Sequence, residues 1–195
     1  MRLDIAVFIL TSTVTPMAVF IPTPPGVPPA APPGLKILAV ERTEHGLLTW
    51  YGSDHSVSSS LNGKAAASPE LSAKLRKRCG SNQIECADVR DSPMALTLSC
   101  EYLLDDIKDK QSTQPTRPRS TCLTMDKYGT CCVTWSKDAP GARTGALYNA
   151  AKDIFNSSQP AGMEWFVAGK SRDTYINGTC LTECLSRAPD DCTDD

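Results

Sequence analysis

Two segments early in the chain alternate apolar and polar residues with the two-residue period of a β-strand. Residues 35–41 are rich in Leu, Ile and Val, and residues 46–51 follow after the turn Thr43-Glu44-His45-Gly46. Alternating side chains point to opposite sides of a strand, so the two segments can share one apolar face. The pattern predicts a β-hairpin whose apolar face consists of Leu38, Val40, Leu48 and Trp50.

A second hairpin is predicted over residues 121–125 and 130–136, around the turn Asp126-Lys127-Tyr128-Gly129. The alternation places Cys131, Val133 and Trp135 on one face of the later strand, and Cys132, Thr134 and Ser136 on the other. The adjacent cysteines Cys131 and Cys132 should therefore bond to different partners rather than to each other. Residues 163–168 form a further short apolar strand candidate, and residues 52–68 and 111–119 have the composition of loops.

Three segments have helical spacing. Ser68-Pro69-Glu70 is a typical helix start, and Leu71, Leu75 and Cys79 follow at steps of four, with Gly80 as the stop. Ser92-Pro93 begins a second helix, and residues 142–155 carry the pattern of a third. The apolar stripe of the second helix consists of Leu96, Cys100, Leu103 and Ile107. Hairpins alternating with helices, without a regular strand–helix–strand repeat, predict an α+β fold: an antiparallel sheet covered by about three helices and stapled by disulfides.

The N-terminal region has the character of a secretory leader. Residues 1–18 combine Arg2, a short apolar core at residues 5–10 and a cleavage point at Met17-Ala18, although Asp4 and Pro16 depart from the usual pattern. The alternative is a disordered cytosolic N-terminus. The apolar run is too short to span a bilayer. Residues 19–34 are proline-rich and predict an extended leader, which leaves residues 35–195 as a single cysteine-rich domain that begins near Leu35.

Composition narrows the classes of partner. The chain has 195 residues, 41% of them hydrophobic, and a net charge of −2 with acidic and basic residues interspersed. This balance gives no electrostatic reason to expect nucleic acid or an anionic membrane as partner. The acidic end, from Asp190 to Asp195, is typical of a solvated terminus. We expect no membrane span once the signal is removed, and an extracellular location.

Nine cysteines indicate a disulfide framework in an oxidising compartment. They are Cys79, Cys86, Cys100, Cys122, Cys131, Cys132, Cys180, Cys184 and Cys192. The odd number fits four bridges and one thiol, and sequence alone leaves the connectivity open. Cys79 and Cys100, on helix stripes, are reasonable partners for the sheet. Zinc is disfavoured because only Cys180 and Cys184 have ligand-like spacing. Asn156 and Asn177 begin glycosylation sequons.

No motif assigns a catalytic, cofactor or metal site. The two histidines, His45 and His55, fall in a turn and a Ser-rich loop, so we expect both to be solvated. A catalytic triad can converge only in the fold, but no nucleophile elbow, zinc-protease motif or phosphate loop is present. A glycosidase-like carboxylate pair has no support in the pattern. Lys77-Arg78 is either a dibasic processing site or, as we favour, a cationic helix end.

Several of these segments together resemble one family. The strings that carry the likeness are Leu47-Leu48-Thr49-Trp50-Tyr51-Gly52, Gly129-Thr130-Cys131-Cys132-Val133-Thr134-Trp135-Ser136, Gly169-Lys170-Ser171-Arg172-Asp173, and the run from Asn177 to Ser186. They are similar to the fungal secreted WD-like domain proteins, and the likeness spans roughly residues 35–192. The resemblance implies a small extracellular α/β protein of uncharacterised function, and it supplies no catalytic residues. No repeat of the WD40 propeller type is present.

Two functions remain. The favoured one is a secreted, non-enzymatic protein that binds an extracellular or cell-wall ligand, as an effector, a toxin-like molecule or a wall component. The alternative is a small secreted hydrolase that uses a histidine or a carboxylate pair. A cleft that joins a histidine to a carboxylate and a hydroxyl would favour the hydrolase, whereas two solvated, separate histidines would favour binding.

Overall fold

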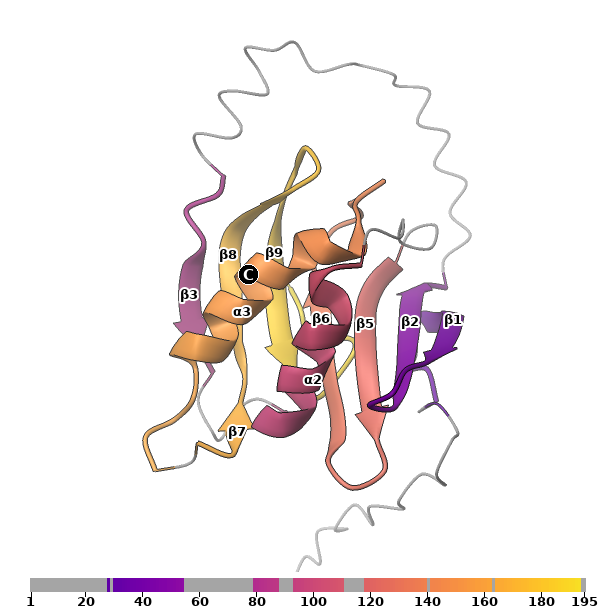
Figure 1. Cartoon of the computed structure of the whole chain (residues 1–195). Coiled ribbons are helices and arrows are strands. Elements are labelled where there is room, and N and C mark those ends of the chain that lie inside the picture. Colours follow the sequence, from indigo (N-terminus) through magenta and orange to yellow (C-terminus); the bar gives the residue numbers. More distant parts are fainter. Residues whose placement is uncertain are drawn as a thin grey trace, which may run out of the picture.

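The computed structural model describes residues 28, 30–54, 79–87, 93–110, 118–139, 141–162 and 164–193. The strands are β1 (Leu35–Arg42), β2 (Leu47–Ser53), β3 (Gln83–Cys86), β4 (Ala95–Leu96), β5 (Pro118–Met125), β6 (Gly129–Trp135), β7 (Phe166–Val167), β8 (Gly169–Ile176) and β9 (Thr179–Ser186). The helices are α2 (Thr97–Lys108), the short 3-10 helix η1 (Thr144–Leu147) and α3 (Tyr148–Ser157). Figure 1 shows most of these strands arranged in one sheet with the two α-helices packed across it.

Seven of the strands form an antiparallel sheet in the order β1-β2-β5-β6-β9-β8-β3, while β4 and β7 pair separately. Three hairpins make up most of the sheet: β1–β2, β5–β6 and β8–β9. The last hairpin turns on Asn177 and Gly178, which have positive φ angles of 44° and 88°. An Asn-Gly pair is the usual sequence of a two-residue hairpin turn in which both residues have positive φ, because glycine and asparagine adopt positive φ at low cost.

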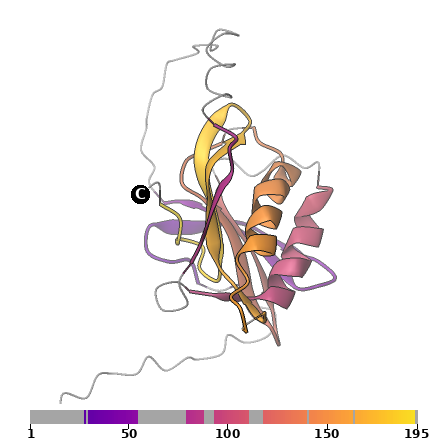
Figure 2. The same cartoon turned by 90° about the vertical axis from the view of Figure 1, so that its left-hand side faces the viewer.

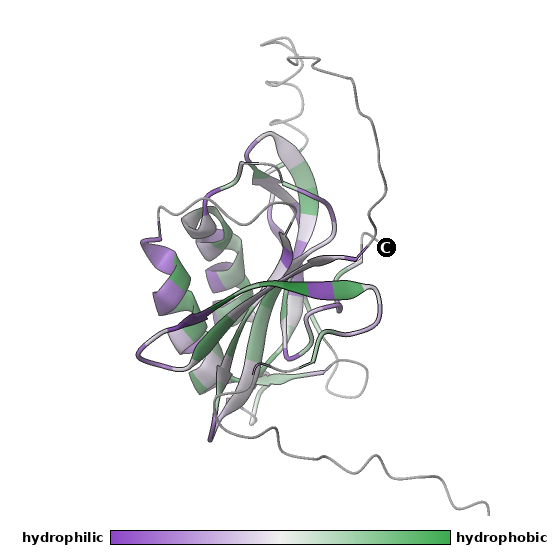
Figure 3. Cartoon of the chain, turned by 90° about the vertical axis from the view of Figure 1, so that its right-hand side faces the viewer, coloured by the Kyte–Doolittle hydropathy of each residue, from purple (hydrophilic) through white to green (hydrophobic). Residues whose placement is uncertain are grey.

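The helices cover one face of the sheet and close the hydrophobic core. Both α2 and α3 lie on the same side of the strands (Figure 2), and hydrophobic residues concentrate in the strands and on the helix sides that meet them (Figure 3). The largest buried core side chains from these layers are Leu48, Leu103, Leu104, Ile107, Leu123, Trp135, Leu147, Ile154, Ile176 and Leu185. Such a layer is expected when the apolar stripe of each helix is buried against the apolar side of strands whose residues alternate between polar and apolar.

The opposite face of the sheet is built from small polar residues and cysteines. Tyr51, Cys122 and Cys132 form a second small cluster there, against which Ala31 and Leu35 pack. Many hydroxyl side chains of the strands are also buried, among them Thr49, Ser120, Thr134, Thr182 and Ser186. Among the described residues, the segments before β1 and after β9, rather than helices, cover this face, which we call the far face.

Four cysteine pairs lie at disulfide distance. Cys100–Cys131 joins α2 to β6, and Cys122–Cys132 joins β5 to β6 across directly opposed positions. Cys79–Cys180 ties the segment before β3 to β9, and Cys184–Cys192 ties the C-terminal segment to the same strand. Cys131 and Cys132 thus have different partners, as their alternation predicts, and Cys86 is the free cysteine.

The predicted α+β architecture with about three helices is wrong. The described residues are mostly β, with nine strands and only two short α-helices of 12 and 10 residues. The predicted helix over residues 68–79 falls almost wholly outside the described residues. The main difference concerns the region from Asp173 on, whose composition is typical of turns but which supplies much of the β8–β9 hairpin. Polar residues fill the far-face positions, and Thr174 and Glu183 interrupt the helix-facing ones as well, so no clear apolar period marks these strands.

Smaller boundary differences have local causes. The helix expected after Ser92-Pro93 begins only at Thr97, because Ala95 and Leu96 pair with β7 instead. The strand expected over residues 163–168 shrinks to Phe166–Val167 for the same reason: its partner β4 is two residues long. The helix expected over residues 142–155 is divided into η1 and α3.

Candidate functional site

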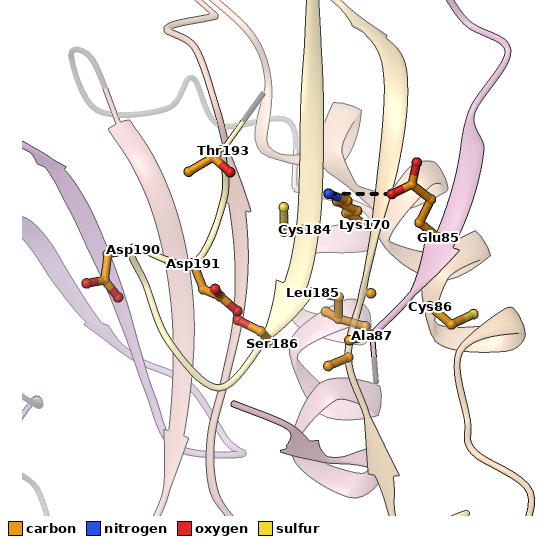
Figure 4. Close-up of a pocket in the computed structure, with 12 residues that line it drawn as sticks. Glu85, Cys86, Ala87, Lys170, Cys184, Leu185, Ser186, Asp190, Asp191 and Thr193 are labelled. Atoms are coloured by element: carbon orange, nitrogen blue, oxygen red, sulfur yellow. Dashed lines mark ion pairs between the residues drawn. The ribbon is translucent and has the colours of Figure 1, made fainter. Parts of the chain in front are cut away.

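A polar cleft lies where β3, β8 and β9 meet the C-terminal segment. Its volume is about 280 Å³. Figure 4 shows the C-terminal residues on one side of the cleft, Glu85 on the other, and Lys170 between them. The lining residues are Glu85, Cys86, Ala87, Ala168, Gly169, Lys170, Cys184, Leu185, Ser186, Asp190, Asp191 and Thr193. Carboxylates, an ammonium group, hydroxyls and a thiol therefore converge on one hollow.

Glu85 is held in place by two cations from β8. The β3–β8 register sets Glu85 opposite Lys170; the Lys170 Nζ lies 3.4 Å from the carboxylate, and Arg172 also pairs with it. The hydrogen bond from Arg172, together with the charges of Arg172 and Lys170, lowers the pKa of Glu85. Glu85 is thus a fixed anion, and the three side chains form an ordered charged wall.

The opposite wall carries Asp190 and Asp191. Partial burial raises the pKa of Asp191, and the neighbouring charge of Asp190 raises it further. The Ser186 hydroxyl and Lys170 act in the opposite direction, so both groups lie close enough to favour the ionised form. The cleft therefore contains two carboxyl groups whose pKa values move in opposite directions.

The C-terminal wall owes its position to local chemistry. The Cys184–Cys192 pair links the segment to β9 over a sequence separation of 8. Ser186 Oγ donates to the Ala188 carbonyl at 3.1 Å and accepts from the Ala188 amide at 3.2 Å. The Arg187 amide donates to the Pro93 carbonyl at 2.8 Å. These bonds turn the chain back over the far face and hold Asp190 and Asp191 against the cleft.

Cys86 marks the rim of the cleft at the edge strand. Its thiol donates to the Ser157 carbonyl at 3.2 Å and accepts from the Ser158 hydroxyl. A side chain at the neighbouring Gly169 would come within 2.6 Å of Ser158 Oγ and 3.0 Å of Ile154 Cγ2. Glycine at this position therefore lets the end of α3 sit directly against β8, which fixes the strand that forms the floor of the cleft.

The family match falls on the same part of the chain. A family model described as Fungal WD-like matches residues 45–192. The chain belongs to the fungal WD-like family. The resemblance seen in the sequence is thereby confirmed, and the matched range includes every strand from β2 to β9 and both aspartates of the cleft. No curated protein and no solved structure matches the chain.

In this fungal WD-like protein, His45 is not a solvated loop residue, so that expectation is wrong. Its ring stacks on Tyr102 with 4.3 Å between the ring centroids, and Nδ1 lies 3.2 Å from Asp106 Oδ1. Tyr102 and Asp106 are one helical turn apart on α2, so both reach the β1–β2 turn. Lys110 adds a 2.7 Å ion pair to Glu41. The ring nitrogens face the carboxylates of Asp106 and Glu44 rather than a hydroxyl, which indicates a clamp between hairpin and helix.

The remaining predicted site residues are distributed over the surface. Asn156 is exposed in the last turn of α3, and Asn177 is exposed in the β8–β9 turn. The signal segment, residues 19–27 of the leader, His55 and Lys77-Arg78 lie outside the described residues. Within the ranges that the structure describes, no three potential metal ligands gather, and no helix there is long and apolar enough to cross a bilayer.

Sequence reasoning missed the cleft and an exposed aromatic pair. Glu85, Lys170 and Asp191 are ordinary charged residues, far apart in sequence, and no spacing links them. Residues 163–168 were expected to form a short apolar strand, yet the exposed fractions of Trp165 and Phe166 are 75% and 39%. The available signal was that the two rings are consecutive. Neighbouring residues of a strand point to opposite sides, so a core on one side can bury only one of them.

Proposed function

We propose that this fungal WD-like protein is secreted and acts outside the cell by binding a ligand, rather than by catalysis. The mature chain would start near Val19, after a signal at residues 1–18, and residues 19–34 would be its leader. Four disulfides support an oxidising compartment, where such bonds persist. Sequencing the N-terminus of protein from culture medium tests this; an intracellular product that retains Met1 would contradict it.

The observation that carries the binding function is the cleft of Figure 4. Its polar groups are held by strand pairing, two ion pairs and a disulfide, so little ordering is needed when a ligand enters. A concave site with a few converging polar groups is the usual form of a small-ligand site. The ligand would be a group that both donates and accepts hydrogen bonds, because carboxylates, hydroxyls and Lys170 face the same space.

An NMR fragment screen tests whether the cleft binds small polar molecules. Neutral sugars, primary amines and carboxylates are added singly to the labelled protein. We expect shifts at the amides of Lys170, Ser186 and Thr193, and loss of those shifts in the variant Lys170→Met. Fragments that perturb only other surfaces, or the same shifts in the variant, would contradict a binding cleft.

A hydrolase is the second candidate, and one observation favours it. Asp191 and Glu85 line the same cleft with pKa values displaced in opposite directions, which is the usual arrangement of an acid and its partner carboxylate. Binding remains the better assignment, because two cations already engage the Glu85 carboxylate and weaken it as a base. The variant Asp191→Asn separates the two: loss of turnover on a glycoside by about 10² or more would indicate catalysis.

A further inference from the structure

Trp165 differs from the other tryptophans of the chain in its exposure. Its exposed fraction is 75%, whereas Trp50 and Trp135 are 5% and 1% exposed and belong to the core. The next residue, Phe166, is 39% exposed. Burying one large aromatic side chain is worth about 1.5–3 kcal/mol, so an aromatic pair left in solvent contributes little to folding. The pair is instead available for contact with another molecule.

The backbone beneath this aromatic pair is firmly anchored. The Thr97 amide donates to the Trp165 carbonyl at 2.9 Å, and the Thr97 hydroxyl donates to the Glu164 carbonyl at 3.0 Å. Phe166 pairs with Leu96 in the β4–β7 ladder. The exposure of Trp165 therefore does not follow from a loosely held loop. An aromatic side chain on an ordered backbone is a partly preorganised contact surface, because only its own rotamer freedom is lost when it binds.

The aromatic pair adjoins the cleft through the chain itself. Ala168, which lines the cleft, is three residues after Trp165, so their Cα atoms are at most about 10 Å apart. Val167 and Ala168 are buried between them and connect β7 to β8 without a loop. An oligosaccharide of several units is long enough to bridge a separation of this size between Trp165 and the polar groups of the cleft.

Resting on the proposed function, we propose that the ligand is a neutral oligosaccharide, with Trp165 as the stacking platform and the cleft as its hydrogen-bonding partner. A sugar ring has an apolar C–H face, which suits an aromatic ring, and a rim of hydroxyls. The carboxylates of Glu85 and Asp191 accept bonds from hydroxyls, and Lys170 donates to them. The aromatic ring therefore suits the apolar face of a sugar, and the polar groups of the cleft suit its hydroxyls.

Two other occupants fit less well. A protein partner needs about 800 Å² on each side with an apolar centre, whereas this aromatic pair is flanked by Gly162, Glu164 and a charged cleft. An anionic membrane surface attracts basic patches, whereas carboxylates of Glu85, Asp190 and Asp191 surround this site. The surrounding charge and polarity favour an uncharged, hydroxyl-rich ligand.

Tryptophan fluorescence tests the inference directly, because Trp165 is the exposed one of the three tryptophans. Soluble oligomers of glucose, mannose and N-acetylglucosamine are titrated into the full protein, and quenching by acrylamide is measured. We expect at least one oligomer to protect the quenchable fraction saturably. Calorimetry should then show affinity for that oligomer at least tenfold weaker in Trp165→Ala, and partly retained in Trp165→Tyr.

The matched control is Tyr128→Ala, which removes another exposed aromatic ring, in the β5–β6 turn. It should bind the oligomer like the parent protein. Thermal denaturation first establishes that each variant is folded. Absence of protection by all three oligomers, or equal affinity in Trp165→Ala, would overturn the inference. In that case fragment shifts in the cleft that persist would leave the proposed function standing, and their absence would remove it as well.

Discussion

The two faces of the seven-stranded sheet are built from alternate residues of the same strands, yet their chemistry is opposite. On β9, Leu181 and Leu185 enter the core beneath the helices, while Cys184 and Ser186 face the C-terminal segment. The helix-covered face is mostly apolar, with Glu183 as a buried exception, whereas the far face is polar, covered by the segments before β1 and after β9, and opened by the cleft. The comparison teaches that stability and recognition are divided between faces, so a substitution should affect mainly one of them.

Ile154→Ala should produce the largest loss of stability. Ile154 is fully buried on α3, and its removal leaves a cavity between helix and sheet. The expected cost is about 2–5 kcal/mol in the free energy of unfolding, measured by urea denaturation. Ile37→Ala is the matched control: Ile37 is 38% exposed on the edge strand, so its loss should cost much less. The folded Ile154→Ala protein should still bind its ligand, and a large loss of affinity would break the division between faces.

The double variant Cys184→Ser with Cys192→Ser should act on the far face. The short loop that this pair closes predicts a stability cost of about 2–3 kcal/mol. The binding free energy at the cleft should weaken by more than the free energy of unfolding, because the wall with Asp190 and Asp191 is no longer tied to β9.

Replacing Cys100 and Cys131 by serine should lower the free energy of unfolding more than the binding free energy, since that pair joins α2 to β6. Equal effects of both double variants on binding would contradict the comparison.

Glu183 and Glu85 provide a comparison of two glutamates on opposite faces. Glu183 is wholly buried between Leu181 and Leu185, and within the described part of the chain neither carboxyl oxygen has a hydrogen-bond partner. Burial raises its pKa well above the usual range, and the Ala151 backbone offsets this only in part. Glu85 has a lowered pKa. The two groups should therefore give stability opposite dependences on pH.

The signs follow from proton linkage. The folded state retains the Glu183 proton above the ordinary pKa of about 4.5, so stability falls as pH rises from there toward the raised pKa. Glu183→Gln should remove that fall, at most about 1.4 kcal/mol per pH unit for one proton. Glu85 contributes stability above its ordinary pKa, and the contribution is lost as pH falls through the lowered value. Denaturation across pH checks both; parallel profiles for Glu183→Gln and the parent would contradict a buried, protonated Glu183.

The sequence predicts the helix-covered face far better than the far face. β2, the β5–β6 hairpin and the stripe of α2 bury apolar residues on one side, and this leaves a period that can be read. On β1 the predicted face is only partly right, because the register shifts between Ile37 and Ala39, and Val40 pairs with Thr49 and is 45% exposed. In β8, the charged residues Lys170 and Arg172 stand where apolar residues would identify a strand. In β9, Ser, Thr and Cys weaken the same pattern. The Asn177-Gly178 turn was the one local signal for that hairpin. The cleft depends on pairing between β3 and β8, whose partners are more than 80 residues apart, so no local pattern contains it.

His45→Ala should have the smallest effect, and on stability alone. The substitution removes the stack on Tyr102 and the bond to Asp106, while the Lys110–Glu41 pair still holds the hairpin on α2. An aromatic stack and one partly exposed hydrogen bond are worth about 1 kcal/mol each, so the melting temperature should fall by several degrees. Asp106→Asn is the control, because it keeps the stack and changes only the bond. Neither variant touches the far face, and adding His55→Ala should likewise leave ligand affinity unchanged. A folded His45→Ala protein whose activity falls by about 10² or more would instead indicate that the His45–Asp106 pair transfers protons. The division between a face that stabilises and a face that binds would then be wrong at this edge of the helix layer.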